Sequence, residues 1–516
     1  MRTLILTFAF ICAGLAVTAQ KPDARLVGLD RYFEKQRIQW NIPGMAIAIV
    51  KDGKIIHSKG YGVRDTKSNL PVTGSTLFAI ASNTKSFTTA ALATLVDAGL
   101  ISWDDKVRKH LPYFQLYSPY VSEEMTIRDL VSHRSGLATF SGDLLWYGST
   151  HSREEIIRRA RHLKPVHGFR EKFGYQNVMF IAAGEIIPVV TGLTWDEYVD
   201  KTFLQSLGMK NSCLSVKDLN KFKEVALPHN EVEGRNQVIN WVNWDNMAPA
   251  GSILASADDV CQWLMLQLGQ GTLNGKTYWS AARSNEMHEM VTPQPIGNFS
   301  RQNMPSKHFG GYGLGWNVFD FHGKKVVNHG GGYDGMISQS FFVPEAGLGA
   351  VILTNNNNWL PGAMMYKILD TFLSDGKGAD VPSLYLKMKK DGDAEDKAKA
   401  DETEKKRLAN ITKPSYPLAA YAGIYECPLY GQCKVWEDER GLRMQFMQTP
   451  LFGGTLNHFE HERFQLVWNE QMMLPKGMVQ FISDIQGRVD EMRIEVENPD
   501  FDFSELHFKK LPDQIK

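Results

Sequence analysis

The sequence predicts an α+β fold in which helices flank an antiparallel sheet, followed by a small all-β domain. Strand-like patterns lie near both ends of residues 20–380, and helical patterns fill the middle. This order favours one large domain whose sheet is assembled from N-terminal and C-terminal pieces. Beyond a charged segment at 381–414, residues 415–516 contain short alternating apolar runs with turn residues between them. Such a series is typical of a small barrel or sandwich.

Residues 1–19 have the pattern of a secretory signal peptide. Arg2 gives a positive start, an apolar run extends from Leu4 to Val17, and small residues lead to Ala19. A short membrane anchor is the alternative, but the run is shorter than the ~20 apolar residues that span a bilayer. We therefore expect cleavage near Ala19, no stable membrane insertion afterwards, and a secreted or periplasmic bacterial protein.

Periodicity indicates the elements of the main domain in order. Residues 23–39 have helical spacing, and residues 44–63 alternate about Asp52-Gly53, which is a strong hairpin signal. An apolar helical pattern covers residues 78–100. The later elements are helical patterns at 126–137, 153–163, 177–209 and 256–271, glycine-broken strands at 324–357, and a closing helix at 364–373.

The segment 381–414 marks a domain boundary. From residue 387 it is charged and almost devoid of large apolar side chains, so we interpret it as a solvated helix or linker. In the tail, Cys427 and Cys433 flank a possible hairpin; they could form a disulfide in an oxidising compartment or remain unpaired. We expect the tail to be a structural lid or a dimerisation surface rather than a ligand site.

Overall charge argues against nucleic acid as a partner. Lys+Arg and Asp+Glu both number 57, and no basic face is interleaved with aromatic residues. We expect a small-molecule or peptide substrate, and the sequence leaves the oligomeric state open. A zinc hydrolase is the chemical alternative, but the 14 histidines form no HExxH or HxHxD cluster. We therefore expect no metal and no cofactor.

Ser82 and Lys85 stand three residues apart at the start of an apolar helix. Residues at i and i+3 share a helix face, so the two side chains can touch. A serine hydroxyl needs a nearby base to become a nucleophile, and a lysine can be that base when burial lowers its pKa. The alternative is a capping serine with a solvated lysine. Ser374 and Lys377 repeat the SxxK spacing. They lie in a polar loop with no apolar helix behind it, so we assign them no catalytic role.

Two further short motifs follow at wide separations. Tyr175-Gln176-Asn177 contains the only tyrosine of the sequence that asparagine follows at two residues. His329-Gly330-Gly331 is glycine-rich and adjoins strand-like sequence. Taken singly, these could be a core tyrosine, a helix cap and a tight turn.

In this order, SxxK, Tyr-x-Asn and His-x-Gly resemble the signature of the penicillin-recognising serine hydrolases. The resemblance covers about residues 25–375. Within the family, the sequence is most similar to the class C β-lactamase-like group, which includes D,D-carboxypeptidases, D-aminopeptidases and related esterases. It implies a β-lactamase/transpeptidase-like fold. Supporting stretches are TIRDLVSHRSGL, APAGSILASADDV and YGLGWNV. The tail resembles the β-rich domain often appended to such enzymes.

The resemblance implies a role for each motif residue. Ser82 would be the nucleophile, and Lys85 would help deprotonate it. Tyr175 would be the partner base, which requires a phenol pKa lowered by adjacent positive charge. Asn177 would orient Lys85 and bind the amide carbonyl of the substrate. His329 would lie across the cleft on the edge strand, where many relatives have lysine.

The glycines of the third motif complete the implied site. Gly331 and Gly332 would bind substrate, and the backbone N–H groups of Ser82 and Gly332 would form the oxyanion hole. The sequence departs from its relatives at Gly330, where serine or threonine often helps hold a substrate carboxylate. This departure weakens the case for an efficient β-lactamase or a strict D-Ala-D-Ala carboxypeptidase.

The resulting hypothesis is an exported serine hydrolase that cleaves an amide or ester through an acyl-enzyme on Ser82. The first alternative is a carboxylesterase of the same family. The second is a penicillin-binding or sensor protein that is acylated without turnover. The three intact motifs argue against a degenerate relative.

Overall fold

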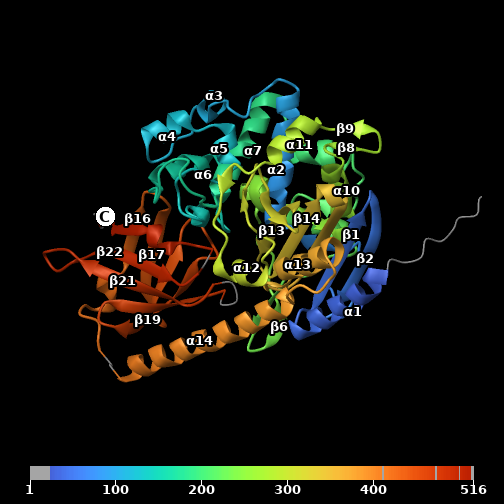
Figure 1. Cartoon of the computed structure of the whole chain (residues 1–516). Helices are drawn as coiled ribbons and strands as arrows, with labels where there is room; N and C mark the ends of the chain where they lie inside the picture. Colours follow the sequence, from blue (N-terminus) through green and yellow to red (C-terminus); the bar gives the residue numbers. More distant parts are fainter. Residues whose placement is uncertain (1–23, 410–411, 471–473, 499, 513–516) are drawn as a thin grey trace, which may run out of the picture.

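An eight-stranded antiparallel sheet forms the centre of the main domain in the computed structural model, which describes residues 24–409, 412–470, 474–498 and 500–512. The strand order is β10-β11-β12-β13-β14-β15-β1-β2. The N-terminal hairpin therefore joins the C-terminal set of strands through pairing of β1 with β15, with β2 at the edge, which confirms the predicted sheet (Figure 1). The strands are β1 (Gly44–Lys51), β2 (Lys54–Gly62), β10 (Thr292–Pro293), β11 (Gly310–Tyr312), β12 (Asn317–Phe321), β13 (Lys324–Tyr333), β14 (Met336–Val343) and β15 (Leu348–Thr354).

The β1–β2 hairpin has a two-residue turn. Lys51 pairs with Lys54, and the intervening Asp52 and Gly53 have φ values of 50° and 74°. Two successive residues with positive φ suit a type I′ turn, for which Asp-Gly is a favoured sequence. The turn chemistry thus fixes the register of the pairs next to the turn, and the register shifts between Ile49 and Val50.

Helices cover both faces of the sheet, and each face has its own core. One core contains Ala46, Ala48 and Val50 of β1 together with residues of α2, α7 and α10. The other contains the alternate side chains of β1 together with α1 and α13. Because successive strand residues point to opposite faces, burial on both sides explains the uninterrupted apolar run of β1. The helices are α1 (Ala24–Gln39), α2 (Thr84–Asp97), α3 (Val107–His110), α4 (Pro119–Glu124), α5 (Ile127–Leu130), α6 (Arg153–Arg159), α7 (Asn177–Thr191), α8 (Trp195–Val199), α9 (Ala248–Gly251), α10 (Ala257–Leu268), α11 (Ala281–Met287), α12 (Asn298–Asn303) and α13 (Leu360–Leu373).

Shorter strands support the loops around this core. They form the sheet β3-β7-β4 and the hairpins β5–β6 and β8–β9. These strands are β3 (Leu77–Ala79), β4 (Ser212–Cys213), β5 (His229–Val232), β6 (Arg235–Val238), β7 (Leu254–Ser256), β8 (Thr272–Leu273) and β9 (Lys276–Thr277).

Within the described residues no single helix is long and apolar enough to cross a membrane. One bent pair of helical segments, Asn177–Thr191 with Trp195–Leu204, is long and apolar enough by length and composition only.

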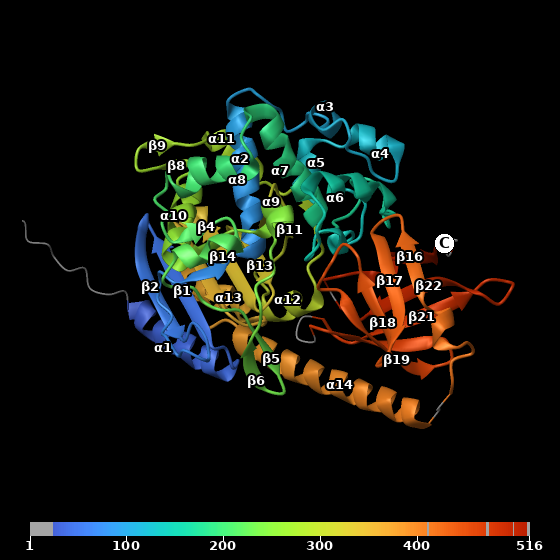
Figure 2. The ribbon, with the colours of Figure 1, turned by 180° about the vertical axis from the view of Figure 1, so that it is seen from behind.

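A single long helix, α14 (Val381–Ala409), occupies the charged segment. It runs from the main domain toward the C-terminal domain along one side of the molecule (Figures 1 and 2). Opposite charges four residues apart pair along it, for example Lys389 with Asp393 at 2.6 Å and Lys406 with Glu402 at 2.7 Å. Such pairs stabilise an exposed helix that has little apolar surface to bury.

The C-terminal domain is a closed eight-stranded antiparallel barrel, one of the two predicted forms. Pairing of β16 with β23 closes it and removes free sheet edges. In the β16–β17 hairpin Cys433 faces Tyr425, and Cys427 faces Gly431, so the two cysteines are not opposite each other and both are free thiols. The strands are β16 (Gly423–Cys427), β17 (Gly431–Asp438), β18 (Gly441–Phe446), β19 (Gly453–Glu460), β20 (Arg463–Trp468), β21 (Gly477–Ser483), β22 (Val489–Val496) and β23 (His507–Lys510).

The barrel packs on the segment of the main domain around residues 141–151. Thr150 N donates to Gln448 O at 2.8 Å, and Gly142 N donates to the Glu505 carboxylate at 2.9 Å. The rings of Tyr147 and Phe501 lie 4.5 Å apart. This segment therefore connects the barrel to the site described next.

Candidate functional site

A tight turn presents Ser82 at the start of α2. Strand β3 ends at Ala79, and the next residue is held in place because Ile80 N donates to Ile253 O at 3.0 Å. Ala81 then has a φ of 46°, a conformation that non-glycine residues rarely adopt. Ser82 lies in the short 3₁₀ turn Ala81–Asn83, and α2 begins at Thr84. Such local strain at the residue before a candidate nucleophile is typical of functional sites.

Lys85 is fully buried and makes three polar contacts. Its Nζ lies 3.1 Å from Ser82 Oγ, 2.7 Å from Asn177 Oδ1 and 2.8 Å from Ala250 O. The last two partners are acceptors and each takes one N–H. In the neutral amine, two N–H bonds used in this way leave the nitrogen lone pair available to the Ser82 hydroxyl. The geometry suits an amine that accepts a proton from Ser82.

The electrostatic environment favours that neutral amine. Burial lowers the pKa of Lys85 to about 7, and the nearby Asp143 carboxyl opposes this shift. A lysine with a pKa near 7 is deprotonated in a large fraction of molecules at neutral pH, whereas an ordinary lysine is not. Lys85 can therefore serve as a base without a further activating group.

Tyr175 lies beside this pair, but its ionisation differs from the sequence-based expectation. Lys85 Nζ is 4.7 Å from the centre of its ring. Burial raises the pKa of Tyr175 well above its usual value, and the hydrogen bond with the Ser82 side chain offsets this only in part. The expected lowering of the phenol pKa is therefore wrong, because desolvation of the phenolate dominates. Tyr175 is a neutral hydroxyl that can relay a proton, not a resting base.

Asn177 connects Lys85 to a carboxyl group that the sequence analysis missed. As the first residue of α7, it donates from Nδ2 to Asp143 Oδ2 at 2.6 Å. This hydrogen bond fixes the amide orientation and directs Oδ1 toward Lys85. Burial raises the pKa of Asp143 to about 8. Asp143 lies in the segment that Glu505 of the barrel contacts at Gly142.

His329 faces the same cleft from β13, although not from an edge strand. β13 pairs with β12 and β14 near the middle of the sheet, because β10, β11 and β12 extend the sheet beyond it. Tyr312 Oη lies 2.9 Å from His329 Nε2, and Gly330 O lies 2.6 Å from Nδ1. Burial and the Lys85 charge lower the pKa of His329 to about 3. The ring is therefore neutral and supplies no positive charge.

Gly331 allows the sheet to approach the nucleophile turn. A Cβ at this position would lie 2.2 Å from Ile80 O and 3.0 Å from Ser82 N. Only glycine fits here without displacement of the Ser82 backbone. The next residue, Gly332, lines the cavity together with Ser82. The two N–H groups proposed for the oxyanion hole therefore belong to segments in direct contact.

Other members of the site lie in family-like stretches for which no individual role was predicted. His133, from TIRDLVSHRSGL, packs its ring 4.2 Å from that of Tyr175 and accepts from Gln176 N at 3.0 Å. Ala250 is in APAGSILASADDV, and Tyr312 is in YGLGWNV. Asp143 lies outside these stretches, and no motif pointed to it. The second SxxK copy is elsewhere: Lys377 is 82% exposed and pairs with Asp375.

A cavity of about 730 Å³ unites the predicted residues. Ser82, Tyr175, Asn177, His329 and Gly332 all line it. Lys85 and Gly331 are not among the lining residues; Lys85 is fully buried and in contact with Ser82, and Gly331 packs against Ile80 O and Ser82 N. Within the described residues, no group of three or more His, Cys, Asp or Glu side chains is arranged to hold a metal ion.

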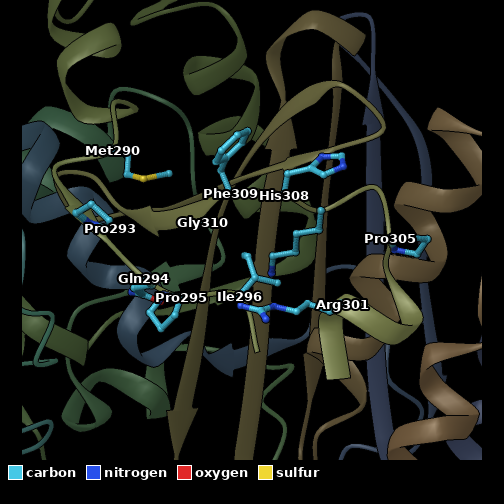
Figure 3. Close-up of a pocket in the computed structure, with 11 residues that line it drawn as sticks. Met290, Pro293, Gln294, Pro295, Ile296, Arg301, Pro305, His308, Phe309 and Gly310 are labelled. Atoms are coloured by element: carbon cyan, nitrogen blue, oxygen red, sulfur yellow. The ribbon is translucent and has the colours of Figure 1, made fainter. Parts of the chain in front are cut away.

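A second hollow, of about 490 Å³, has different chemistry. Proline, methionine and aromatic side chains line it together with Arg301 and His308 (Figure 3). None of the predicted site residues reaches this hollow. The chemistry of Ser82 and Lys85 therefore belongs to the larger cavity alone.

Family models match both parts of the chain. The model described as Beta-lactamase matches residues 29–370. A model described as a domain of unknown function (DUF3471) matches residues 408–510. The boundary between the two matches lies within residues 371–407, which include most of α14.

Similar proteins include curated sequences and solved structures. The chain is 28% identical to "Unguisins hydrolase ungD'" of Aspergillus campestris, over 78% of this chain and 76% of that protein. It is 27% identical to "Protein flp" of Staphylococcus aureus (strain N315), over 64% of each. The octameric penicillin-binding protein homologue from Pyrococcus abyssi has a TM-score of 0.61 at 23% identity, covering 94% of this chain and 100% of that chain. EstCE1, a hydrolase with promiscuous acyltransferase activity, has a TM-score of 0.56 at 19% identity, covering 68% and 99%.

Proposed function

The chain belongs to the beta-lactamase family of serine hydrolases, and on this basis we propose that it cleaves an amide or ester through an acyl-enzyme on Ser82. The observation that carries the proposal is the buried amine of Lys85, 3.1 Å from Ser82 Oγ and held by two other acceptors. Burial of an amine costs free energy, and an apolar side chain would fill the same space without that cost. The position of Lys85 beside one hydroxyl therefore indicates a chemical role rather than a structural one.

The proposed reaction begins with proton transfer from Ser82 to neutral Lys85. Ser82 Oγ forms a bond to the carbonyl carbon, and the oxyanion accepts hydrogen bonds from the N–H groups of Ser82 and Gly332. The proton then passes through the Tyr175 hydroxyl to the leaving group, and the bond to that group breaks. Water subsequently attacks the acyl-enzyme, which releases the acid and regenerates Ser82.

Asn177 and His329 have supporting roles in this scheme. Asn177 holds Lys85 in place through Oδ1, and Asp143 holds Asn177. His329 is a neutral wall of the cleft that contacts Tyr312. Together with the missing hydroxyl at Gly330, a neutral His329 gives little support to recognition of a substrate carboxylate.

The proposed bond type remains an amide or an ester. Similarity to a protein named a hydrolase favours turnover over an acylated receptor. A carboxylesterase of the same family is the second candidate. We further propose export to the periplasm or the exterior, on the N-terminal pattern of residues 1–19, which lie outside the described residues.

Covalent labelling tests this function without knowledge of the natural substrate. A neutral fluorophosphonate should add one phosphonyl group to the native protein, and peptide mapping should find it on Ser82. The second SxxK serine, Ser374, provides an internal control because its hydroxyl is engaged by Asp370 and its Lys377 faces solvent. Labelling of another residue, or none, would contradict the proposal. Steady release of product from short acyl esters or amides would then separate an enzyme from a receptor.

A further inference from the structure

Glu505 of the barrel holds the main domain with both of its carboxylate oxygens. It ends the short 3₁₀ turn Phe503–Glu505, between β22 and β23. One oxygen accepts from the Ser141 hydroxyl, and the other accepts from Gly142 N at 2.9 Å. Burial raises the pKa of Glu505, and these two hydrogen bonds offset that shift in part. A half-buried carboxyl group at the domain contact thus fixes two successive residues of the main domain.

Residues 139–143, called the site segment below, have an unusual backbone. Phe140 has a φ of 64°, and Gly142 has a φ of 81°. The left-handed conformation is unfavourable for phenylalanine, so surrounding contacts must stabilise it. Within the main domain Leu163 packs against Gly142, where a Cβ would lie 2.7 Å from Leu163 Cδ1. The barrel supplies a further contact through Glu505, which keeps the site segment in this path.

The site segment contacts two of the residues that are assigned to catalysis. Tyr175 N donates to Thr139 Oγ1 at 3.1 Å, and Phe140 N donates to Tyr175 O at 2.8 Å. Asn177 Nδ2 donates to Asp143 Oδ2 at 2.6 Å. The backbone of Tyr175 and the side chain of Asn177 are therefore both held by this segment.

Hydrogen bonds continue from Asp143 to the nucleophile. Asn177 Oδ1 accepts from Lys85 Nζ at 2.7 Å, and Lys85 Nζ lies 3.1 Å from Ser82 Oγ. The oxygen and nitrogen of an asparagine amide are nearly equal in shape, so its partners decide which of them faces Lys85. Asp143 Oδ2 takes the NH₂ group and leaves the oxygen for Lys85. An amide turned the other way would direct an N–H at the amine and remove one of its acceptors.

We propose that Glu505 is a positioning residue for the reaction at Ser82. It holds the site segment in the place where Asp143 orients Asn177, and Asn177 in turn orients Lys85. The inference rests on the proposed function, because it gives the barrel a part in that same reaction. It differs from the expected lid or dimerisation surface, since neither of those roles requires hydrogen bonds to the site segment. The main domain then needs the docked barrel for full activity.

Replacement of Glu505 by methionine tests this role in the full-length protein. Methionine has a similar length but accepts from neither Ser141 nor Gly142. The rate constant for phosphonylation of Ser82 at saturating neutral fluorophosphonate, measured on the high-pH plateau, should fall by about tenfold or more, as a small misplacement of catalytic groups produces. The half-saturating concentration of the probe should change less, because Glu505 is not among the residues that line the cavity.

Two further substitutions of Glu505 separate hydrogen bonding from charge. Glu505→Gln should keep a rate within about threefold of wild type, because its oxygen can accept from Gly142 N while its NH₂ group donates to Ser141 Oγ. Glu505→Asp keeps the charge but draws the carboxylate back by one methylene, so it should slow labelling in the same direction as Glu505→Met. Thermal unfolding of each variant shows that the protein is folded.

A double-mutant cycle tests the route through Asp143. Asp143→Ala interrupts the same route one step later, so the losses from Asp143→Ala and Glu505→Met should combine to less than their product. Gln448→Ala is a matched control in the same interface. Gln448 Oε1 accepts from Thr150 Oγ1 at 3.0 Å, outside the site segment, and its loss should leave the labelling rate unchanged.

Three results would overturn the positioning role of Glu505. They are labelling of Glu505→Met at the wild-type rate, losses that multiply fully in the double variant, and an equal loss in Gln448→Ala. Absence of labelling at Ser82 in the wild-type protein would overturn the proposed function and the positioning role together. Normal labelling of both wild type and Glu505→Met would overturn the positioning role alone, so the two failures are distinguishable.

Discussion

Replacement of Lys85 by methionine is expected to lower kcat by about 10²–10⁴-fold, which is the usual contribution of a general base. Methionine has a similar length and no charge, so it fills the same buried channel. The substitution removes the amine 3.1 Å from Ser82 Oγ and leaves the hydroxyl with no group that can accept its proton. Turnover of a short acyl ester, compared at saturating substrate, measures the effect.

Two comparisons make the Lys85 result specific. Lys377→Met alters the lysine of the second SxxK copy and should leave kcat unchanged, because that side chain is solvated. Circular dichroism and thermal unfolding show whether Lys85→Met folds, since Asn177 Oδ1 and Ala250 O lose a donor in this variant. A well-folded Lys85→Met protein with wild-type kcat would exclude Lys85 as the base.

Replacement of Gly331 by alanine is expected to lower kcat by about 10²–10³-fold, the usual cost of a lost oxyanion-hole donor. The new methyl group would lie 2.2 Å from Ile80 O and 3.0 Å from Ser82 N, so the nucleophile turn or β13 must move. Either movement separates the N–H groups of Ser82 and Gly332 from the position of the developing oxyanion. Because the hydroxyl and Lys85 remain, the loss should fall mainly on kcat.

A second glycine of the same sheet provides the control. Gly349 lies in β15, and a Cβ there would meet its nearest atoms at 3.5 Å, which is ordinary packing. Gly349→Ala should therefore retain activity, measured with the same ester. If Gly331→Ala were as active as Gly349→Ala, contact between β13 and the Ser82 turn would not contribute to the reaction.

The sequence predicted the parts of the site that depend on local spacing. The i, i+3 relation placed Ser82 near Lys85, and the structure brings Tyr175, Asn177 and His329 to the same cavity. Asp143 could not be predicted in this way. It reaches Asn177 from a segment that contacts the barrel at Gly142, and no periodicity in the sequence records such tertiary contacts.

Two errors concern properties that depend on the whole fold. The strand with His329 was expected at a sheet edge, but three further strands extend the sheet beyond it. The base role implied for Tyr175 required a lowered phenol pKa, but burial opposes the phenolate more strongly than nearby groups favour it. Strand order and desolvation both depend on the tertiary structure. Prediction of the C-terminal domain, in contrast, required only the pattern of short alternating strands, which left two forms, a barrel and a sandwich.

Catalysis in this scheme depends most on neutral Lys85 acting on Ser82, and the pH dependence of Ser82 labelling tests this most directly. The rate constant for phosphonylation of Ser82, followed by intact mass from pH 5 to 10, should rise through a midpoint near 7 and then reach a plateau. The sign follows because burial lowers the pKa of Lys85 to about 7, so the amine becomes a base as the pH rises through that value. The same rise should be absent from Lys85→Met. A wild-type rate that is independent of pH, or one that rises without a plateau to pH 10, would contradict the account.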